Sequence, residues 1–182
     1  MKKIIFLIIF ASTLFSAESK YIKEKDYSNN DFRVFVGLSA SYGYFSSDKT
    51  TDSSIYSYGL YAGLPIFDDY EVIIKKNIIT TKDFEYNQQS LIFNIPLTSR
   101  KIRKVYIGIV GGKGTIEFNN ENTETIDDYF YGLHIGKRFK YTRNYYVRIE
   151  LEAMKYNYKR EDLKEFSNDA SINFNYGFEY RF

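Results

Sequence analysis

The residues that could carry out catalytic or metal chemistry are few in this sequence. It contains one histidine, His134, and no cysteine. The lack of cysteine excludes a disulfide framework, a thiolate metal site, a cysteine nucleophile and a lipidated N-terminal cysteine. Acyl hydrolysis would need a nucleophile such as serine beside the histidine, but Ile135 and Gly136 follow it. We therefore expect no catalytic residues, no cofactor and no metal site.

The segment GIVGGKGT at 108–115 has the glycines and the lysine of a phosphate-binding loop but not their spacing. Such a loop requires a glycine, four further residues and then Gly-Lys-Ser/Thr. Here Gly114 follows Lys113, and Ile107 stands where the first glycine is needed. The net charge of +2 gives no strong field for nucleic acid either. We therefore expect neither nucleotide nor nucleic-acid binding.

Apolar and polar residues alternate over most of the chain, so we expect its polar side chains to lie on β-strands. A period of two is the pattern of a β-strand with one apolar face. Eight such segments are predicted, at about 33–46, 54–67, 70–80, 85–97, 103–118, 127–139, 145–158 and 171–182. The last segment shows the pattern best, with Phe174, Tyr176, Phe178, Tyr180 and Phe182 on one face.

The fifth segment departs from strict alternation. Ile116 and Phe118 are out of phase with Val105 and Ile107. Glycines within a strand often mark a bulge, so we predict a bulge here that restores the register.

The third segment contains two adjacent lysines. Lys76 falls among the apolar residues of one face, and Lys75 lies on the other face. Either a bulge turns both lysines to the same side, or Lys76 extends its ammonium group along the apolar surface toward water.

The lengths of the strands and of their connections predict a closed barrel. Strands of about 11–14 residues exceed the ~5–6 residues typical of soluble sheets and match a tilted strand that crosses a bilayer. Short and long connections alternate, as they do in up-and-down barrels of the outer membrane. The sequence thus predicts an all-β fold, an eight-stranded antiparallel up-and-down transmembrane β-barrel over residues 32–182.

Charged residues on the polar faces predict a filled lumen. An arginine that faces lipid at the midplane costs about 2–4 kcal/mol, and the lumen of an eight-stranded barrel is filled by side chains. Buried charges need partners, so we predict a lumen charge network of Glu71, Arg138, Arg148, Glu150, Glu152, Glu179 and Arg181. The network serves packing in one interpretation. In another, its ion pairs form a gate that switches to open a narrow pore.

Residues 1–19 are predicted to form a cleaved signal peptide. Two lysines near the start precede an apolar run over 4–14, which has the length of a signal peptide and falls short of the ~20 residues of a membrane-spanning helix. Cleavage after Ser19, which places Ala17 at position −3, fits the requirement for small residues better than cleavage after Ala17, which places Phe15 there. Residues 20–31 follow as a polar arm.

The whole pattern resembles the small eight-stranded outer-membrane proteins, meaning the OmpA-type transmembrane domain and its OmpX-like relatives. The resemblance rests on the signal peptide, on YSYGLYAGLPIFDDYEV (56–72), on YFYGLHIGKRF (129–139) and on the final strand. It implies a monomer in the outer membrane of a Gram-negative bacterium. The aromatic residues that end at Phe182 resemble the signal read by the barrel assembly machinery. The chain ends with the barrel, so we expect no peptidoglycan-binding domain.

Three classes of function are open. The first is a non-enzymatic structural or surface-interaction protein, with a role in envelope integrity or adhesion, whose loops at 47–53, 119–127 and 159–169 contact an extracellular ligand. The second is a lipid A-modifying enzyme, although the His-x-Ser motif of barrel deacylases is broken at Gly136. The third is a soluble secreted barrel with its aromatic face turned inward.

Outer-membrane lipids are the expected neighbours in the first class. Lipopolysaccharide phosphates could contact the basic residues of the outer loops, which are Lys49, Lys82, Lys159 and Arg160. Phospholipid headgroups of the inner leaflet could contact the basic residues of the opposite turns, which are Arg100, Lys101, Arg103, Lys104, Lys140 and Arg143.

Overall fold

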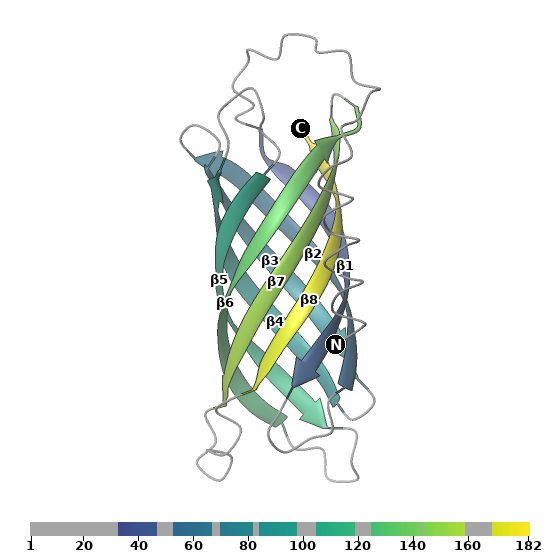
Figure 1. Cartoon of the computed structure of the whole chain (residues 1–182), viewed down its shortest axis with the longest axis vertical. Coiled ribbons are helices and arrows are strands. Elements are labelled where there is room, and N and C mark those ends of the chain that lie inside the picture. The colour runs from purple at the N-terminus through teal and green to yellow at the C-terminus, as the bar shows by residue number, and fades with distance from the viewer. Residues whose placement is uncertain are drawn as a thin grey trace. The chain divides into compact units, whose positions relative to one another are not determined.

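The structure is a computed structural model that describes residues 33–46, 53–66, 70–81, 84–97, 105–118, 125–142, 144–158 and 169–182. These residues form β1 (Phe35–Ser46), β2 (Ser53–Ile66), β3 (Tyr70–Thr80), β4 (Phe84–Pro96), β5 (Val105–Phe118), β6 (Thr125–Lys140), β7 (Tyr145–Tyr158) and β8 (Ala170–Arg181). Each strand pairs antiparallel with the next, and β8 pairs with β1. The predicted closed eight-stranded antiparallel barrel is confirmed (Figure 1). The predicted signal peptide, the polar arm and most residues of the predicted loops lie outside the described residues.

The strands are staggered around the barrel. Following the paired residues once around, from Tyr180 through every strand, leads back to β8 at Ala170, ten residues away. A closed barrel requires such a stagger, and it tilts the strands against the barrel axis. Because β1 begins where β8 ends, we call that end of the barrel the terminus end and the opposite end the loop end.

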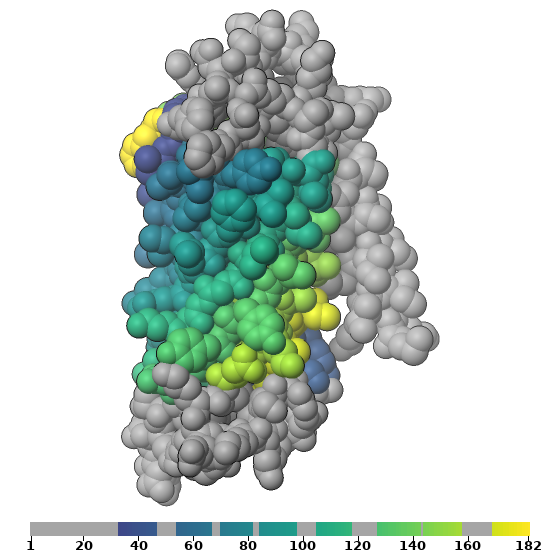
Figure 2. All heavy atoms as spheres, turned by 90° about the vertical axis from the view of Figure 1, so that its left-hand side faces the viewer, coloured from purple at the N-terminus to yellow at the C-terminus, as the bar shows by residue number. Residues whose placement is uncertain are grey.

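The outer face of the barrel is apolar over most of its area. Val, Ile, Tyr and Phe favour extended strands because their side chains fit a pleated surface. Successive side chains of a strand point to opposite faces, so every second residue points outward. Exposed large side chains on this face include Leu38, Leu60, Ile74, Leu91, Ile109, Leu133 and Phe178. Figure 2 shows one side of this wall, on which side chains of the middle of the chain, in teal and green, form a band.

The lumen contains both polar and aromatic side chains. The buried charged residues of the terminus-end half include Glu71, Arg148, Glu179 and Arg181. The loop-end half holds an apolar cluster that includes Phe45, Phe84, Phe130 and Tyr156. The lumen is therefore packed in two layers of different chemistry. In the part of the chain that the structure describes, no helix is long and apolar enough to cross a membrane.

The predicted bulge in β5 is wrong. β5 pairs without interruption with β4 from Tyr106 to Phe118 and with β6 from Val105 to Glu117. The side chain of Ile116 therefore points into the lumen, where it is 2% exposed. The alternation of polar and apolar residues gave the wrong face for Ile116 because the lumen of the loop-end half is itself apolar. Apolar side chains can therefore point inward in that half of the barrel.

The two adjacent lysines of β3 lie on opposite faces. Their strand pairs regularly with β4, with Lys75 opposite Ser90 and Lys76 opposite Gln89. Lys75 is buried in the lumen, and Lys76 is exposed on the outer face. Of the two arrangements that the sequence left open, the structure has the one without a bulge.

Candidate functional site in the barrel lumen

Glu71 is the centre of a buried cluster of charges near the terminus end. It lies one residue after the start of β3 and is 3% exposed. Its Oε1 pairs with Nη1 of Arg138 and, at 2.5 Å, with Nη2 of Arg181, while its Oε2 accepts a hydrogen bond of 2.5 Å from Nη2 of Arg148. One carboxylate therefore holds guanidinium groups from three strands, β6, β7 and β8.

Two further carboxylates balance the three arginines. Glu179 lies between Arg181, whose Nε donates to Oε1 at 2.5 Å, and Arg148, whose Nε is 2.6 Å from Oε2. Glu150 is 3.7 Å from Nη1 of Arg148. The cluster thus pairs three arginines with three glutamates. Such balance is required, because a buried charge without a partner is strongly destabilising.

Aromatic rings enclose the cluster. The guanidinium of Arg148 lies 5.1 Å from the ring centroid of Phe35, and that of Arg181 lies 4.7 Å from the same centroid. Tyr146 lies 5.0 Å from the guanidinium of Arg181. Cations over ring faces are stabilised by the quadrupole of the ring, more so where water is excluded. The rings therefore fix the planes of the arginines that Glu71 holds.

A chain of hydrogen bonds leads from the cluster to His134. Asn94 Nδ2 donates to Oε2 of Glu71 at 3.4 Å, and Asn94 Oδ1 is 2.7 Å from Nε2 of His134. Because a carboxylate only accepts hydrogen bonds, the amide must turn its NH2 to Glu71 and its oxygen to the histidine. Nε2 of His134 therefore carries a proton, which it donates to the Asn94 oxygen.

His134 is not arranged for nucleophilic catalysis. It is 2% exposed in the lumen, and its hydrogen-bond partner in the described structure is the Asn94 amide rather than a hydroxyl. A serine nucleophile requires a histidine within hydrogen-bond reach of its oxygen. The described residues also contain no group of three or more His, Asp or Glu that could hold a metal ion.

The structure places the seven residues of the predicted charge network in the lumen but does not join all of them. Six form the cluster just described. Glu152 lies opposite His134 in the pairing of β6 with β7 and accepts a hydrogen bond of 3.4 Å from Asn173 Nδ2. Glu152 is the next inward-facing residue after Glu150 toward the loop end of β7. Its carboxylate therefore lies farther from the arginines.

Sequence reasoning missed the polar neighbours of the cluster. Asn94 and Tyr106 were not expected to take part, yet the Tyr106 hydroxyl donates a hydrogen bond of 2.6 Å to Glu150. A signal for Tyr106 exists in the sequence, because its partner across the strands is Gly136. A Cβ atom at that glycine would come within 2.6 Å of the tyrosine ring, so the ring occupies the space that the glycine leaves.

The aromatic layer closes the loop-end half of the lumen. The ring of Tyr156 lies 5.5 Å from that of Phe45, 5.8 Å from that of Tyr86 and 6.2 Å from that of Phe130, measured between centroids. Tyr86 donates a hydrogen bond of 2.5 Å to the buried carboxylate of Asp128. Edge-to-face and tilted rings at these distances pack closely, so these four rings fill much of the loop-end half of the lumen.

A small cavity lies beside the charge cluster. It has a volume of about 10 Å³ and is lined by residues that include Lys75, Tyr61, Arg148 and Glu150. That is room for about one water molecule. The side chains beside the charge cluster are therefore closely packed.

Comparison with known proteins finds similarity at the level of structure. No protein-family model matches the chain, and no curated protein does. The crystal structure of Neisserial surface protein A (NspA) matches with a TM-score of 0.71 and 14% identity, over 82% of this chain and 97% of that chain. Ail, the attachment invasion locus protein of Yersinia pestis, matches with a TM-score of 0.54 and 12% identity, over 84% of this chain and 100% of that chain.

A second structure of Ail, in complex with the heparin analogue sucrose octasulfate, matches with a TM-score of 0.50 and 12% identity, over 82% of this chain and 98% of that chain. Likeness at such low identity concerns the fold. The family resemblance predicted from the sequence is confirmed to that extent. The chain has the closed eight-stranded antiparallel fold of the small outer-membrane β-barrels.

Proposed function

We propose that this protein is an integral outer-membrane protein of a Gram-negative bacterium with a non-enzymatic structural or surface-interaction role. The observation that carries the proposal is the inverted distribution of polarity. Large apolar side chains such as Leu60 and Leu133 are exposed on the outside, whereas Arg148, Glu179 and Arg181 are buried inside. A soluble protein of this kind would expose its apolar face to water, which costs about 25 cal/mol for each Å².

The strand lengths support a membrane-spanning barrel. The strands have 11 to 16 residues, and a tilted strand needs about 9–11 residues to cross the hydrocarbon region. The terminus end then faces the periplasm and the loop end faces outside. Residues 1–19 serve as the cleaved signal peptide, and the aromatic face of β8 with Phe182 serves as the assembly signal.

Surface interaction is favoured over transport because the lumen is filled. NspA is named a surface protein and Ail an attachment and invasion protein, and Ail has been solved with a heparin analogue. By analogy, we assign the outer loops of this chain to contact with lipopolysaccharide or an extracellular ligand. The ion pairs around Glu71 serve packing in this proposal, and the gated pore is the alternative.

The proposal is tested first by heat-modifiable gel mobility and fractionation. The unheated protein from outer-membrane fractions should migrate differently from the boiled protein, because a folded barrel resists the detergent. Recovery in a soluble periplasmic fraction without detergent would overturn the proposal and favour the secreted barrel. Whole-cell binding, compared between the intact protein and a variant without residues 159–168, then tests the surface role.

The two alternatives have their own readouts in the same preparation. Single-channel recordings of the purified barrel should show no conductance for the native chain, and conductance that changes when Arg148 and Glu150 are neutralised would favour the gate. The lipid A mass spectrum of cells with His134→Ala should equal that of cells with the native protein. A changed spectrum would favour the enzyme.

A further inference from the structure

Lys75 is a buried cation outside the charge cluster. It points into the lumen from β3 and is 5% exposed. Its backbone oxygen accepts a hydrogen bond from the Ser90 hydroxyl, but its ammonium group forms no ion pair and no hydrogen bond with the described residues. The arginines and glutamates of the cluster already balance one another, so Lys75 adds one positive charge. A buried charge needs a compensating partner.

Two further donors beside Lys75 also have no partner. Tyr61 lies opposite Lys75 in the pairing of β2 with β3 and is 7% exposed. Its hydroxyl makes no hydrogen bond, and neither does Nδ2 of Asn175 on β8, a residue that is 2% exposed. Buried polar groups nearly always have a hydrogen-bond partner. Three buried donors without one therefore require an explanation.

The three donors line the same cavity, the one of about 10 Å³ beside the charge cluster. Arg148 lines it as a second cation, and Glu150 is the carboxylate that lines it. That carboxylate already accepts a hydrogen bond of 2.6 Å from Tyr106 and lies 3.7 Å from Arg148. The cavity is therefore rich in donors and has an excess of positive charge.

Glu152 does not supply the missing negative charge. It is not among the residues that line the cavity, and no ion pair joins it to Lys75. The hydrogen bond that its carboxylate accepts comes from Asn173 on the neighbouring strand, at 3.4 Å. The compensating group for Lys75 is thus best sought within the cavity itself.

We propose that this cavity binds one monatomic anion, chloride in ordinary media, which accepts hydrogen bonds from Lys75, Tyr61 and Asn175. A water molecule could accept hydrogen bonds from two of these donors but would not compensate the charge of Lys75. Phosphate and sulfate are too large, because the cavity has room for a single small species. The bound ion joins β2, β3 and β8 from inside. This inference concerns the lumen and does not depend on the proposed surface role.

The first test is urea unfolding of the full mature barrel in sodium chloride and in sodium gluconate of equal ionic strength, with the folded fraction read from gel mobility without heating. Because the site is buried, each sample is refolded in the salt in which it is measured. An anion that binds the folded state alone lowers the unfolding equilibrium constant. We expect a constant about tenfold smaller in chloride, as for a concentration about ten times the dissociation constant.

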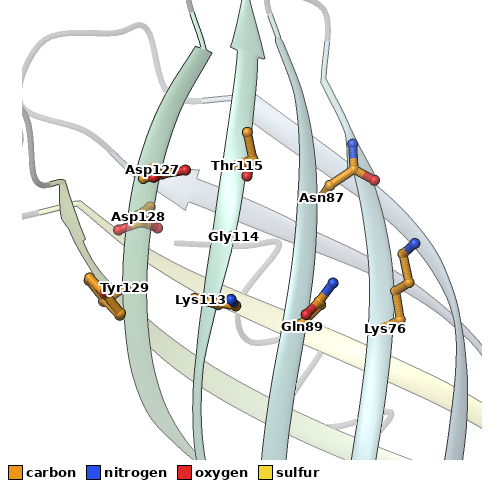
Figure 3. Close-up of a pocket in the computed structure, with 9 residues that line it drawn as sticks. All are labelled: Lys76, Asn87, Gln89, Lys113, Gly114, Thr115, Asp127, Asp128 and Tyr129. Carbon is orange, nitrogen blue, oxygen red and sulfur yellow. The ribbon is translucent and has the colours of Figure 1, made fainter.

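Lys75→Met and Lys76→Met form a matched pair of variants. Lys75→Met removes the proposed ligand of the anion and should abolish the difference between the two salts. A methionine in place of a buried cation without a partner should still allow folding, since such replacements are often neutral or stabilising. Lys76 is exposed on the outer wall, where it lines a surface groove of about 330 Å³ (Figure 3). Lys76→Met should keep the full chloride effect.

The second test locates the ion. Crystals of the native barrel refolded in sodium bromide should give an anomalous bromine peak between Lys75, Tyr61 and Asn175. Crystals of Lys75→Met should give no peak there. If Lys75→Met fails to fold, Tyr61→Phe takes its place, because it removes one donor and keeps the ring. Tyr61→Phe should reduce the chloride effect about threefold or more.

Three results would overturn the inference. A chloride effect of equal size in the native chain and in Lys75→Met would show that the salt acts at the surface. A native barrel of equal stability in chloride and gluconate would show that no anion is bound. Density for a water molecule in the cavity, without bromine signal, would show that water links Lys75 to its neighbours instead.

Discussion

The variant Glu71→Gln tests the charge cluster most directly. Glu71 is the acceptor for three arginines, and its side chain is 4% exposed. Glutamine keeps the shape of the side chain and one acceptor oxygen but removes the negative charge. The cluster would then contain three arginines and two glutamates, which leaves one positive charge in a buried site without compensation.

The expected loss follows from the cost of an uncompensated buried charge. Removal of one partner of a buried ion pair typically destabilises a protein by about 3–5 kcal/mol. We expect the lower part of this range, about 3 kcal/mol, because glutamine still accepts one hydrogen bond. The control is Glu85→Gln on β4, which accepts a hydrogen bond of 3.5 Å from Asn87 and takes part in no ion pair with the described residues. It should change stability by less than about 0.5 kcal/mol.

A double variant makes the reasoning specific to charge balance. Arg138 is the most exposed arginine of the cluster, at 15% for its side chain. Adding Arg138→Gln to Glu71→Gln leaves two arginines with two glutamates. It should therefore restore about 1 kcal/mol or more relative to Glu71→Gln alone, which is a coupling of the size seen between residues in contact.

The assay is urea unfolding of the barrel in a lipid or detergent environment, with the folded fraction read from gel mobility without heating. Free energies are extrapolated linearly to zero urea. The reasoning would be refuted if Glu71→Gln cost no more than Glu85→Gln. It would also be refuted if the two substitutions in the cluster were additive, because balance would then contribute nothing.

Two further predictions use the same gel. Gly136→Ala places a Cβ atom within 2.6 Å of the Tyr106 ring and should cost about 1–3 kcal/mol by overpacking, whereas Gly111→Ala, with open space within 4 Å, should change stability by less than about 0.5 kcal/mol; equal losses would show that the ring does not depend on the glycine. Deletion of Phe182 should lower the amount of folded protein in the outer membrane more than deletion of any outer loop does, and an equal or smaller effect would remove Phe182 as an assembly signal.

The period of two was sufficient to predict the strands, their order and most of their faces. Val36 and Leu38 point outward and Phe35 inward, as the alternation in β1 requires. Such prediction works because every residue of a long strand in a closed barrel must face one side or the other, and few prolines or bulges interrupt the pairing. The alternation failed at Ile116, where the inner layer is as apolar as the outer belt.

The partners within the charge cluster could not be predicted from the sequence. Glu71 and Arg181 are 110 residues apart and meet only because the stagger of the closed barrel brings the start of β3 level with the end of β8. A shift of the stagger by two residues would keep every face unchanged and still separate them. The same dependence explains why Glu152 was included in the prediction yet lies outside the cluster.

Side chains fill the described lumen at two levels. The charge cluster and the aromatic layer occupy the axis at two levels, and the cavity between the strands beside Lys75 holds about 10 Å³. A solute would have to break the pairs of Arg148 with Glu71 and Glu179 and also displace Tyr156 to pass. In the proposed function the lumen therefore serves packing, and contact with partners occurs at the surface of the barrel.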